Sequence, residues 1–412
     1  LTPDVVEGFK KLDSQAEDVQ EEEDVAEFNS NSQQIPSSQN LGGNIKIHIG
    51  EGKDIDIEIP FPVLGEGQSN IQVQQDEKKN LQIVEEDREL RKLTRKYFKI
   101  DKVEFGAETK IDGTTLYIRK DICKDAVKSQ NLVVDMEIDF ITPDRYNEFS
   151  NTIMDVQPIA TKEDGELGEG ITRVLDGVVM MVTGTDEKGV QIGEFGSSEG
   201  ILEENIMWGR PGAPELAEIF IKTNVTIKEG KNMERPGPMA AHKATDFITQ
   251  EIREALKKLD ESLVIDTEEF VQRRRAHKKK VVIVKEIMGQ GAMHDNYLMP
   301  QEPVGVLGAK ANVDLGNVPI VVSPLQVLDG CVHALTCIGP ASKETSRHYF
   351  REPLVLEAMA DEEIDLAAVI FVGSPQANSE KFYVSKLLGM TVEAMDADGA
   401  IVTTEGFGNN HV

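Results

Sequence analysis

The sequence predicts an α/β protein, in which a β-rich mixed middle domain precedes a C-terminal doubly wound, mainly parallel sheet, after a flexible acidic arm and a hairpin. Two observations predict this class: short apolar strands separated by glycine turns through the middle of the chain, and buried strands alternating with helices after Lys280. A chain of 412 residues exceeds the size at which one core keeps growing. We therefore expect divisions at residues 1–44, 45–99, 100–270 and 271–412.

The composition narrows the class of partner. A formal net charge of −29 argues against nucleic acid or an anionic membrane surface as the main partner. No apolar run approaches the roughly 20 residues that span a bilayer. Three cysteines in so long a chain do not form a disulfide framework, which indicates a reducing, cytoplasmic setting. Because the first residue is Leu1 rather than Met, we expect a trimmed N-terminus.

The N-terminal region consists of segments that differ in composition and in hydrophobic pattern. Residues 1–44 are acidic and rich in Gln, Ser and Asn, which predicts a flexible arm because they bury too little apolar surface to fold. Residues 45–49 and 55–59 each alternate apolar and polar side chains around a glycine-containing turn, which predicts a β-hairpin. Apolar residues at helical spacing over 81–98 predict a helix that connects this hairpin to the core.

The middle of the chain predicts mixed strands, at residues 102–106, 115–118, 132–138, 178–184 and 218–222. An amphipathic helix is predicted over residues 238–259, with His242 near its start in a capping or surface role. The basic run at 273–280 follows. We interpret it as a solvated helix end and strand entrance rather than a docking site for an acidic partner or the acidic arm.

The C-terminal region predicts buried strands at residues 281–287, 318–322, 367–373 and 400–404, with a helix at 379–395. This alternation implies a mainly parallel sheet whose ligands bind at the carboxyl ends of the strands. The last strand is followed by a loop without a returning helix, so we expect a further C-terminal segment in this fold.

A glycine-rich turn follows the first of these strands. Gly289-Gln290-Gly291 sits where a nucleotide-binding turn would, but His294 replaces the third glycine of the dinucleotide pattern and no helix follows. We interpret it as a turn that lets the backbone approach a small substrate, with His294 pointing into the same cleft.

A zinc site is one interpretation of the next polar segment. It would use two cysteines and two histidines, namely Cys331, His333, Cys337 and His348. The Cys-x-His spacing is tighter than in common zinc sites and a second ligand pair is missing, so we expect no metal. Cys331 is most simply a small buried hydrophobe.

Internal cleavage of the Thr336–Cys337 bond is the other interpretation. The Cys337 thiol attacks the Thr336 carbonyl to give a thioester, and β-elimination then releases the upstream chain and leaves a dehydroalanine that hydrolyses to a pyruvoyl group. This route needs an oxyanion donor and a nearby base, and His333 lies one turn before Cys337 if the backbone is helical there. From composition alone, a structural cysteine ranks ahead of this route.

Several segments resemble one family. Residues 329–351, with Leu335-Thr336-Cys337-Ile338-Gly339-Pro340 at their centre, resemble the processing region of the clostridial amino-acid reductase proproteins. These include the glycine, sarcosine and betaine reductase component B proproteins and the D-proline reductase proproteins. The likeness extends to residues 103–106, 170–177, 289–293, 314–319 and 404–409.

The resemblance implies that Cys337 is the precursor of a covalent pyruvoyl group, and that cleavage after Thr336 yields two partner subunits. The extension before Ile100 resembles the D-proline reductase type, which implies D-proline as the substrate. The pyruvoyl carbonyl then activates the ring nitrogen, and a selenocysteine-containing partner subunit opens the ring to 5-aminovalerate. An electron-donating thiol or redox protein reduces the selenium afterwards. The sequence itself runs continuously through the cleavage point, as in an unprocessed precursor.

The resemblance also suggests roles for nearby side chains. An arginine binds a carboxylate in a bidentate manner, so Arg347 and Arg351 are the candidate anchors for the substrate. The candidate proton-transfer groups are His294, His333 and His348.

Three hypotheses follow for function. The first is a pyruvoyl subunit of a hetero-oligomeric reductase in Stickland-type amino-acid fermentation, of the D-proline type ahead of the glycine, sarcosine or betaine type. The second is a noncatalytic scaffold homologue that binds the selenoprotein. The third is a nucleotide-binding α/β enzyme that uses the turn from Gly289 to Gly291.

Overall fold

The computed structural model describes residues 86–192, 199–232, 236–288, 318–334, 345–374 and 378–404, and the backbone of 44–49, 55–60, 297–298 and 313–314. The chain divides into two compact units, Leu1–Leu81 and Gln82–Val412. In the first unit, β1 (Asn44–Ile49) pairs antiparallel with β2 (Ile55–Pro60), which confirms the predicted hairpin. The predicted arm, apart from Asn44, lies outside the described residues.

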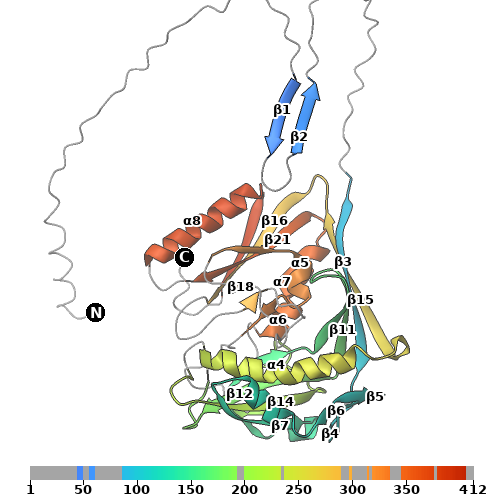
Figure 1. Cartoon of the computed structure of the whole chain (residues 1–412), viewed down its shortest axis with the longest axis vertical. Coiled ribbons are helices and arrows are strands. Elements are labelled where there is room, and N and C mark those ends of the chain that lie inside the picture. The colour runs from blue at the N-terminus through green and yellow to red at the C-terminus, as the bar shows by residue number, and fades with distance from the viewer. Residues whose placement is uncertain are drawn as a thin grey trace, which may run out of the picture. The chain divides into compact units, whose positions relative to one another are not determined.

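The second unit is a mixed α/β structure with several mixed sheets (Figure 1). One four-stranded sheet has the order β10-β11-β3-β15. Strand β3 is parallel to β11 and antiparallel to β15, so it lies in the middle of this sheet. The strands are β3 (Arg88–Lys99), β10 (Ala160–Asp164), β11 (Gly170–Asp176) and β15 (Val264–Arg274).

Strand β3 replaces the helix predicted over residues 81–98, so that prediction is wrong over the described part. Leu93 and Phe98 are buried in the core, and Arg95 is buried as well. The Arg95 guanidinium donates to the carbonyl oxygens of Leu328 and Phe350 and lies 3.8 Å from the centre of the Phe350 ring. The apolar spacing suits a helix or a strand, and pairing with two strands distant in sequence decides for the strand.

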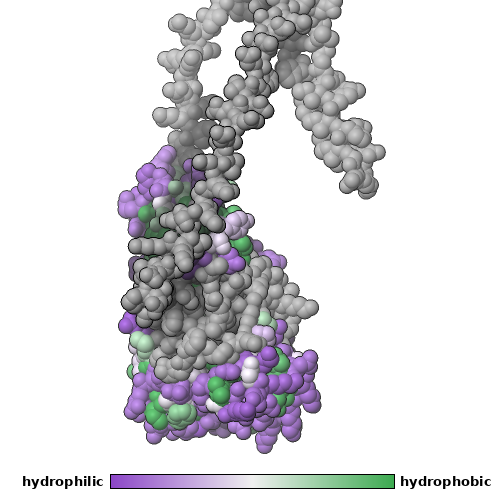
Figure 2. Space-filling view, turned by 90° about the vertical axis from the view of Figure 1, so that its left-hand side faces the viewer, coloured by the Kyte–Doolittle hydropathy of each residue, from purple (hydrophilic) through white to green (hydrophobic). Residues whose placement is uncertain are grey.

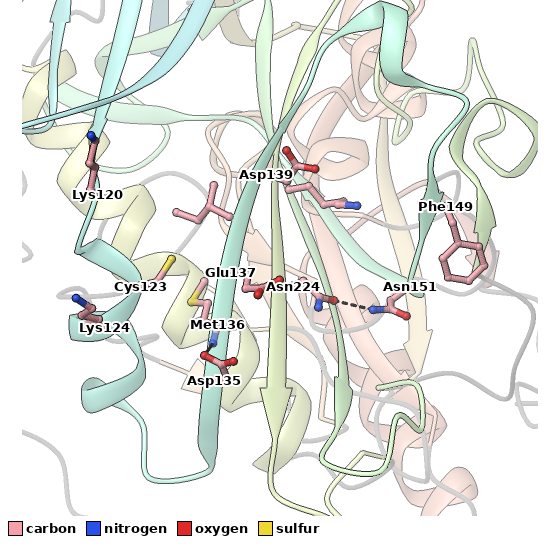
Figure 3. A pocket seen from close by; sticks show the side chains of 12 residues that line it. Lys120, Cys123, Lys124, Asp135, Met136, Glu137, Asp139, Phe149, Asn151 and Asn224 are labelled. Atoms are coloured by element: carbon pink, nitrogen blue, oxygen red, sulfur yellow. Dashed lines mark hydrogen bonds between the residues drawn. The ribbon is translucent and has the colours of Figure 1, made fainter.

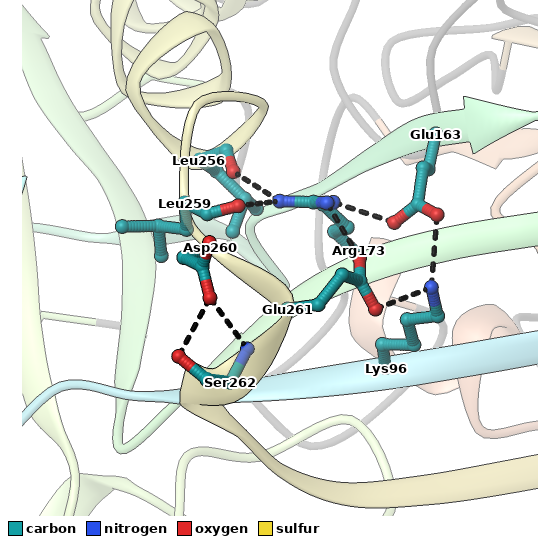
Figure 4. A network of polar contacts seen from close by, with 8 residues as sticks. All are labelled: Lys96, Glu163, Arg173, Leu256, Leu259, Asp260, Glu261 and Ser262. Atoms are coloured by element: carbon teal, nitrogen blue, oxygen red, sulfur yellow. Dashed lines mark hydrogen bonds and ion pairs between the residues drawn. The ribbon is translucent and has the colours of Figure 1, made fainter.

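A network of charged side chains ties this sheet to the turn after helix α4 (Pro236–Leu256) (Figure 4). Arg173 on β11 donates to Glu163 on β10 at 2.6 Å and to Glu261 at 2.7 Å. Lys96 on β3 bridges the same two carboxylates at 2.8 and 2.7 Å. Arg173 also donates to the carbonyl oxygen of Leu259 at 2.6 Å. Because the Arg173 side chain is only 8% exposed, these contacts hold the strands and the turn more firmly than surface ion pairs do.

A second four-stranded sheet, of order β7-β14-β12-β9, carries α4 on one face. Ala244, Ile248 and Ile252 of α4 share one core with Ile221 and Val225 of β14. The helix predicted over residues 238–259 is therefore confirmed, as are the strands predicted at 132–138, 178–184 and 218–222. The strands are β7 (Val133–Ile141), β9 (Ile153–Gln157), β12 (Val178–Asp186) and β14 (Ile219–Ile227).

Shorter elements surround these two sheets. The strands predicted at 102–106 and 115–118 are confirmed as β4 and β6, in a sheet of order β4-β6-β5. The short elements are β4 (Lys102–Gly106), β5 (Lys110–Asp112), β6 (Thr115–Arg119), α2 (Ile122–Ser129), η1 (Pro143–Arg145), β8 (Phe149–Ser150), β13 (Gly200–Ile201), α3 (Leu202–Asn205) and η2 (Glu261–Leu263).

The third four-stranded sheet has the order β19-β21-β16-β22. β16 is parallel to β21 and β22, whereas β19 is antiparallel to β21, so the sheet is mixed. Residues of α8 pack on one face, and residues of α5 and α7 share a core with the other face. The predicted strands and helix are confirmed as β16 (Lys279–Met288), β19 (Ile320–Val322), β21 (Ile364–Ser374), β22 (Gly399–Thr404) and α8 (Asn378–Ala394); α5 (Pro324–Leu328) and α7 (Pro353–Ala360) accompany them.

The basic run at residues 273–280 joins two strands, so it is a strand end rather than the predicted helix end. Arg274 pairs with Asp365 at 3.0 Å, and Lys279 pairs with Asp398 at 2.8 Å. Part of this positive charge is thus balanced within the chain.

The surface shown in Figure 2 is mostly hydrophilic where the structure describes it, and its hydrophobic residues form small separate patches. Among the described residues, no helix has the length and apolar character needed to cross a membrane.

Candidate active site

A buried polar cluster lies where β9, α4 and β20 (Val332–His333) meet. Asp155 and Gln157 lie two residues apart on β9, so they share one face of the strand. His242 and Asp246 lie one turn apart on α4, and His333 ends β20. Each of these five side chains is at most 1% exposed. Polar groups buried this completely are costly unless they bond to one another or to a ligand.

His333 occupies the centre of the cluster. Its Nε2 atom lies 2.9 Å from His242 Nδ1, 3.0 Å from the amide nitrogen of Gln157 and 4.0 Å from Asp155 Oδ2. Its Nδ1 atom lies 3.7 Å from Asp246 Oδ2. One edge of the imidazole thus faces three polar groups, and the other edge faces a carboxylate.

Burial sets the protonation of the cluster. Desolvation, together with the charge of Arg253, lowers the pKa of His333 to about 3, so this imidazole is neutral near pH 7. Desolvation raises the pKa of Asp155 to about 7, although hydrogen bonds from Ser346 and Gln157 oppose the rise. Asp155, with a pKa near neutrality, is therefore the group of this cluster suited to proton transfer, whereas the neutral His333 is a weak base.

Ser346 connects this cluster to the predicted cleavage segment. It begins helix α6 (Ser346–Phe350), and it binds Asp155 through its hydroxyl group at 2.6 Å and its backbone amide at 2.8 Å. The same hydroxyl oxygen accepts a hydrogen bond from the backbone amide of Ala334 at 2.9 Å. The described residues on both sides of segment 335–344, which contains Thr336 and Cys337, are therefore joined directly through the Ser346 hydroxyl group, which Asp155 holds in place.

The structure brings one of the predicted histidines into this cluster, namely His333. Thr336, Cys337 and His294 lie outside the described residues, so their predicted roles stay predictions. His348 lies on α6, with Nε2 3.5 Å from Glu352 Oε1. Burial by itself raises the pKa of Glu352, but the His348 hydrogen bond and the Lys285 charge outweigh it and lower that pKa to about 2.

The two predicted substrate anchors already have partners. The buried Arg347 guanidinium holds both carboxylate oxygens of Glu218 at 2.6 Å in a bidentate pair. Arg351 is 39% exposed and pairs with Glu215 at 2.6 Å. A substrate carboxylate would have to displace Glu218 to reach Arg347, so Arg351 is the more accessible of the two.

Cys331 is fully buried, which confirms its interpretation as a small core residue. Burial raises the pKa of its thiol well above the usual range. Among the described residues, the side chains placed to share a metal ion are Asp155, His242 and His333.

The sequence interpretation missed most of the cluster. His242 was expected to cap a helix or face solvent, which is wrong because it is 1% exposed. A signal was present on α4, where polar residues recur at helical spacing beside the apolar face. These residues are His242, Thr245, Asp246, Thr249 and Arg253, and all of them are buried.

A hollow of about 710 Å³ lies between α2 and β7 (Figure 3). Lys120 and Lys124 line one side of it, opposite Asp135 and Glu137 on β7. Burial and these two carboxylates raise the pKa of Cys123 to about 11, so its thiol is protonated near pH 7 and is a poor nucleophile. The buried histidine cluster is the stronger candidate site.

Comparison with known proteins now defines the class. Residues 91–412 match the family of glycine/sarcosine/betaine reductase component B subunits, and the chain belongs to this family. This confirms the family resemblance and makes the chain a component of a reductase.

The chain is more similar to one kind of reductase in this family than to the others. The chain is 62% identical to the D-proline reductase proprotein PrdA of Acetoanaerobium sticklandii, over 432 aligned residues that cover 100% of this chain and 68% of the relative. It is 21% identical to the sarcosine reductase complex component B subunit alpha of Peptoclostridium acidaminophilum, over 75% of this chain and 72% of the relative. It is 24% identical to the glycine reductase complex component B subunits alpha and beta of A. sticklandii, over 75% and 71%. No solved structure matches the chain.

Proposed function

We propose that this chain is a D-proline reductase proprotein whose Cys337 becomes a pyruvoyl group. The observation that carries the proposal is the 62% identity, along the whole chain, to a protein named as a D-proline reductase proprotein. The sarcosine and glycine reductase relatives are only 21% and 24% identical and cover 75% of the chain, which favours D-proline over their substrates.

Processing would begin with attack of the Cys337 thiol on the Thr336 carbonyl, which breaks the amide C–N bond and forms a thioester. Loss of the α-hydrogen of residue 337 then breaks its Cβ–S bond, so the upstream chain leaves as a thiocarboxylate that water converts to a carboxylate and sulfide. Water converts the remaining dehydroalanine to a pyruvoyl group and ammonia. His333, three residues before Thr336 in the chain, is a candidate to accept a proton here, although the lowering of its pKa to about 3 by burial makes it a weak base. His294 and His348 stay candidates.

The described residues fit this chemistry in one respect. Ser346, which is bound to Asp155, accepts a hydrogen bond from the backbone amide of Ala334, two residues before Thr336, so the chain enters the cleavage point from a fixed position. The pyruvoyl carbonyl would supply an electron sink that makes the ring nitrogen of D-proline a leaving group. Arg351, or Arg347 after loss of Glu218, would bind the substrate carboxylate.

The rest of the reaction would lie on partner chains. A selenocysteine-containing subunit would attack the α-carbon, and an electron-donating thiol or redox protein would return two electrons, so that D-proline becomes 5-aminovalerate. The sarcosine and glycine relatives are named as components of complexes, which supports a hetero-oligomer that includes the cleaved counterpart subunit. We place this assembly in the cytoplasm.

We propose that residues 271–412 form a doubly wound domain on the sheet β19-β21-β16-β22, because residues of α8 and of α5 and α7 pack on its two faces. Residues 100–270 would be the β-rich domain. The carboxyl end of β16 then leads along the chain into the segment that contains His294.

Intact-mass analysis of the purified full chain tests the proposal. We expect cleavage between Thr336 and Cys337 and a downstream fragment that reacts with hydrazine. The Cys337→Ala chain should stay whole, whereas the matched control Cys331→Ala should still be cleaved because that thiol is buried in the core. An uncleaved chain that supports turnover with the selenoprotein would contradict the mechanism.

Substrate choice has its own test. In the complex reconstituted with the selenoprotein, D-proline should be reduced, and glycine, sarcosine and betaine should not. Reduction of one of these three instead would assign the chain to that reductase. An uncleaved chain that binds the selenoprotein and reduces none of the four substrates would favour the noncatalytic scaffold.

A further inference from the structure

We propose that Asp155, His242 and His333 bind a divalent cation of the zinc type, with the side-chain amide of Gln157 at a fourth position. The donor set differs from the Cys331 and Cys337 pattern that the sequence suggested. It also goes beyond the proposed function, in which no metal takes part.

The candidate ligand atoms lie close to the spacing that a metal site requires. One ligand atom from each of Asp155, His242 and His333 lies within 4.8 Å of the others. His242 Nδ1 and His333 Nε2 are 2.9 Å apart, and His333 Nε2 and Asp155 Oδ2 are 4.0 Å apart. Tetrahedral zinc, with bonds of about 2.0–2.1 Å, holds its ligand atoms about 3.3–3.4 Å apart. The observed spacings lie on either side of this value, so small side-chain rotations would complete the site.

Gln157 supplies an independent observation. Its amide nitrogen lies 3.0 Å from both Asp155 Oδ2 and His333 Nε2, and 3.4 Å from His242 Nδ1. Its Oε1 atom is buried and has no hydrogen-bond partner among the described residues. The oxygen and nitrogen atoms of a side-chain amide are nearly the same size. A half-turn of the Gln157 amide group therefore places its oxygen beside the three candidate ligand atoms of Asp155, His242 and His333. That oxygen is a metal ligand, so a bound cation would give it a partner.

The surrounding residues match those that support metal ligands. A metal-binding histidine usually donates its second ring N–H to a carboxylate, and Asp246 Oδ2 faces His333 Nδ1 at 3.7 Å, just beyond hydrogen-bond distance. A ligating carboxylate is usually hydrogen-bonded in turn, and Asp155 accepts two hydrogen bonds from Ser346. The cation would also stabilise the ionised form of the buried Asp155.

The donor chemistry selects the class of cation. Two imidazole nitrogens with one carboxylate oxygen suit zinc and similar transition metals, whereas calcium and magnesium prefer oxygen ligands alone. All four side chains are at most 1% exposed, so the site is closed and of the structural kind. Such a cation would fasten β9 and α4 to β20, just before the segment that contains Thr336.

Metal analysis of the full chain tests this proposal without reference to cleavage or turnover. After loading with zinc and gel filtration, we expect about one zinc per chain by mass spectrometry. Cobalt in its place should show the visible absorption of a tetrahedral ion. His242→Ala and Asp155→Asn should each lower the zinc content at least tenfold. The matched control is His277→Ala, an exposed histidine in the turn between β15 and β16, which should keep the zinc.

Folding is checked by circular dichroism. If the His242→Ala chain does not fold, the wild-type chain decides: a chelator should lower its melting temperature, and zinc should restore it. A zinc content below about 0.1 per chain, with a melting temperature that neither chelator nor zinc shifts, would overturn the proposal. Full zinc content in a folded His242→Ala chain would overturn it as well.

Discussion

Ser346 donates a hydrogen bond to each carboxylate oxygen of Asp155. Its hydroxyl group lies 2.6 Å from Oδ2, and its backbone amide lies 2.8 Å from Oδ1. Its hydroxyl oxygen also accepts a hydrogen bond from Ala334 at 2.9 Å. Strand β9 of the second sheet and the residue that follows β20 are thus both bound to Ser346 at the start of α6. Since residues 335–344 lie between Ala334 and Thr345, this contact sets where the predicted cleavage segment starts and ends.

Ser346→Ala should slow cleavage between Thr336 and Cys337, followed over time by intact mass. The substitution leaves the buried Asp155 carboxylate and the Ala334 amide short of a partner, which should cost about 1–3 kcal/mol of unfolding free energy. The matched control is Ser262→Ala, whose exposed hydroxyl donates to Asp260 at 2.6 Å. It should change stability by no more than about 0.5 kcal/mol and leave cleavage unaltered. Cleavage of Ser346→Ala at the wild-type rate would separate this contact from processing.

Arg347→Ala should destabilise the chain strongly. It leaves the Glu218 carboxylate, which is 9% exposed, without its bidentate partner, and breaking a buried pair costs about 3–5 kcal/mol. Arg351→Ala should cost no more than about 1 kcal/mol, because that pair with Glu215 is exposed. Urea unfolding measures the free energy of unfolding of both variants. If Arg351 anchors the substrate carboxylate, its variant should instead raise the KM for D-proline in the reconstituted complex.

Glu352→Gln should change the pH dependence of stability. The folded-state pKa of Glu352 is lowered from 4.5 to about 2, so its ionised form stabilises the fold above about pH 4.5. That contribution, on the order of 3 kcal/mol, is lost as the pH falls from about 4.5 through about 2. The gap in unfolding free energy between wild type and variant should therefore narrow over this range. Glu357→Gln, an exposed change on the same helix, should follow the wild-type curve.

Two glycine substitutions should act in opposite directions. Gly389 lies in α8 where an added methyl group meets nothing within 4 Å, so Gly389→Ala should stabilise the chain by about 1 kcal/mol through helix propensity. Gly184 lies in β12, where a methyl group would overlap the carbonyl oxygen of Val225 on β14. Gly184→Ala should destabilise it by about 2 kcal/mol or more. Thermal or urea unfolding compares the pair, and equal effects would contradict this packing.

Local patterns predicted much of the fold. Alternation predicted the hairpin β1–β2, and the helical face of α4 and the buried runs at β16 and β21 were also predicted. The same kind of pattern failed at β3, because apolar spacing does not say whether a segment pairs with distant strands. It failed at His242 because helical position alone does not show which polar residue turns inward.

The sequence by itself determined the family and the position of the predicted cleavage, since the residues around Thr336 and Cys337 that carry the resemblance are continuous in the chain. Tertiary structure alone decided which side chains meet upstream of that bond. Gln157 and His333 are 176 positions apart, yet they lie 3.0 Å from each other. The physical reason is that packing of α4 and β20 against β9 places these groups, and burial then sets their protonation and their need for partners.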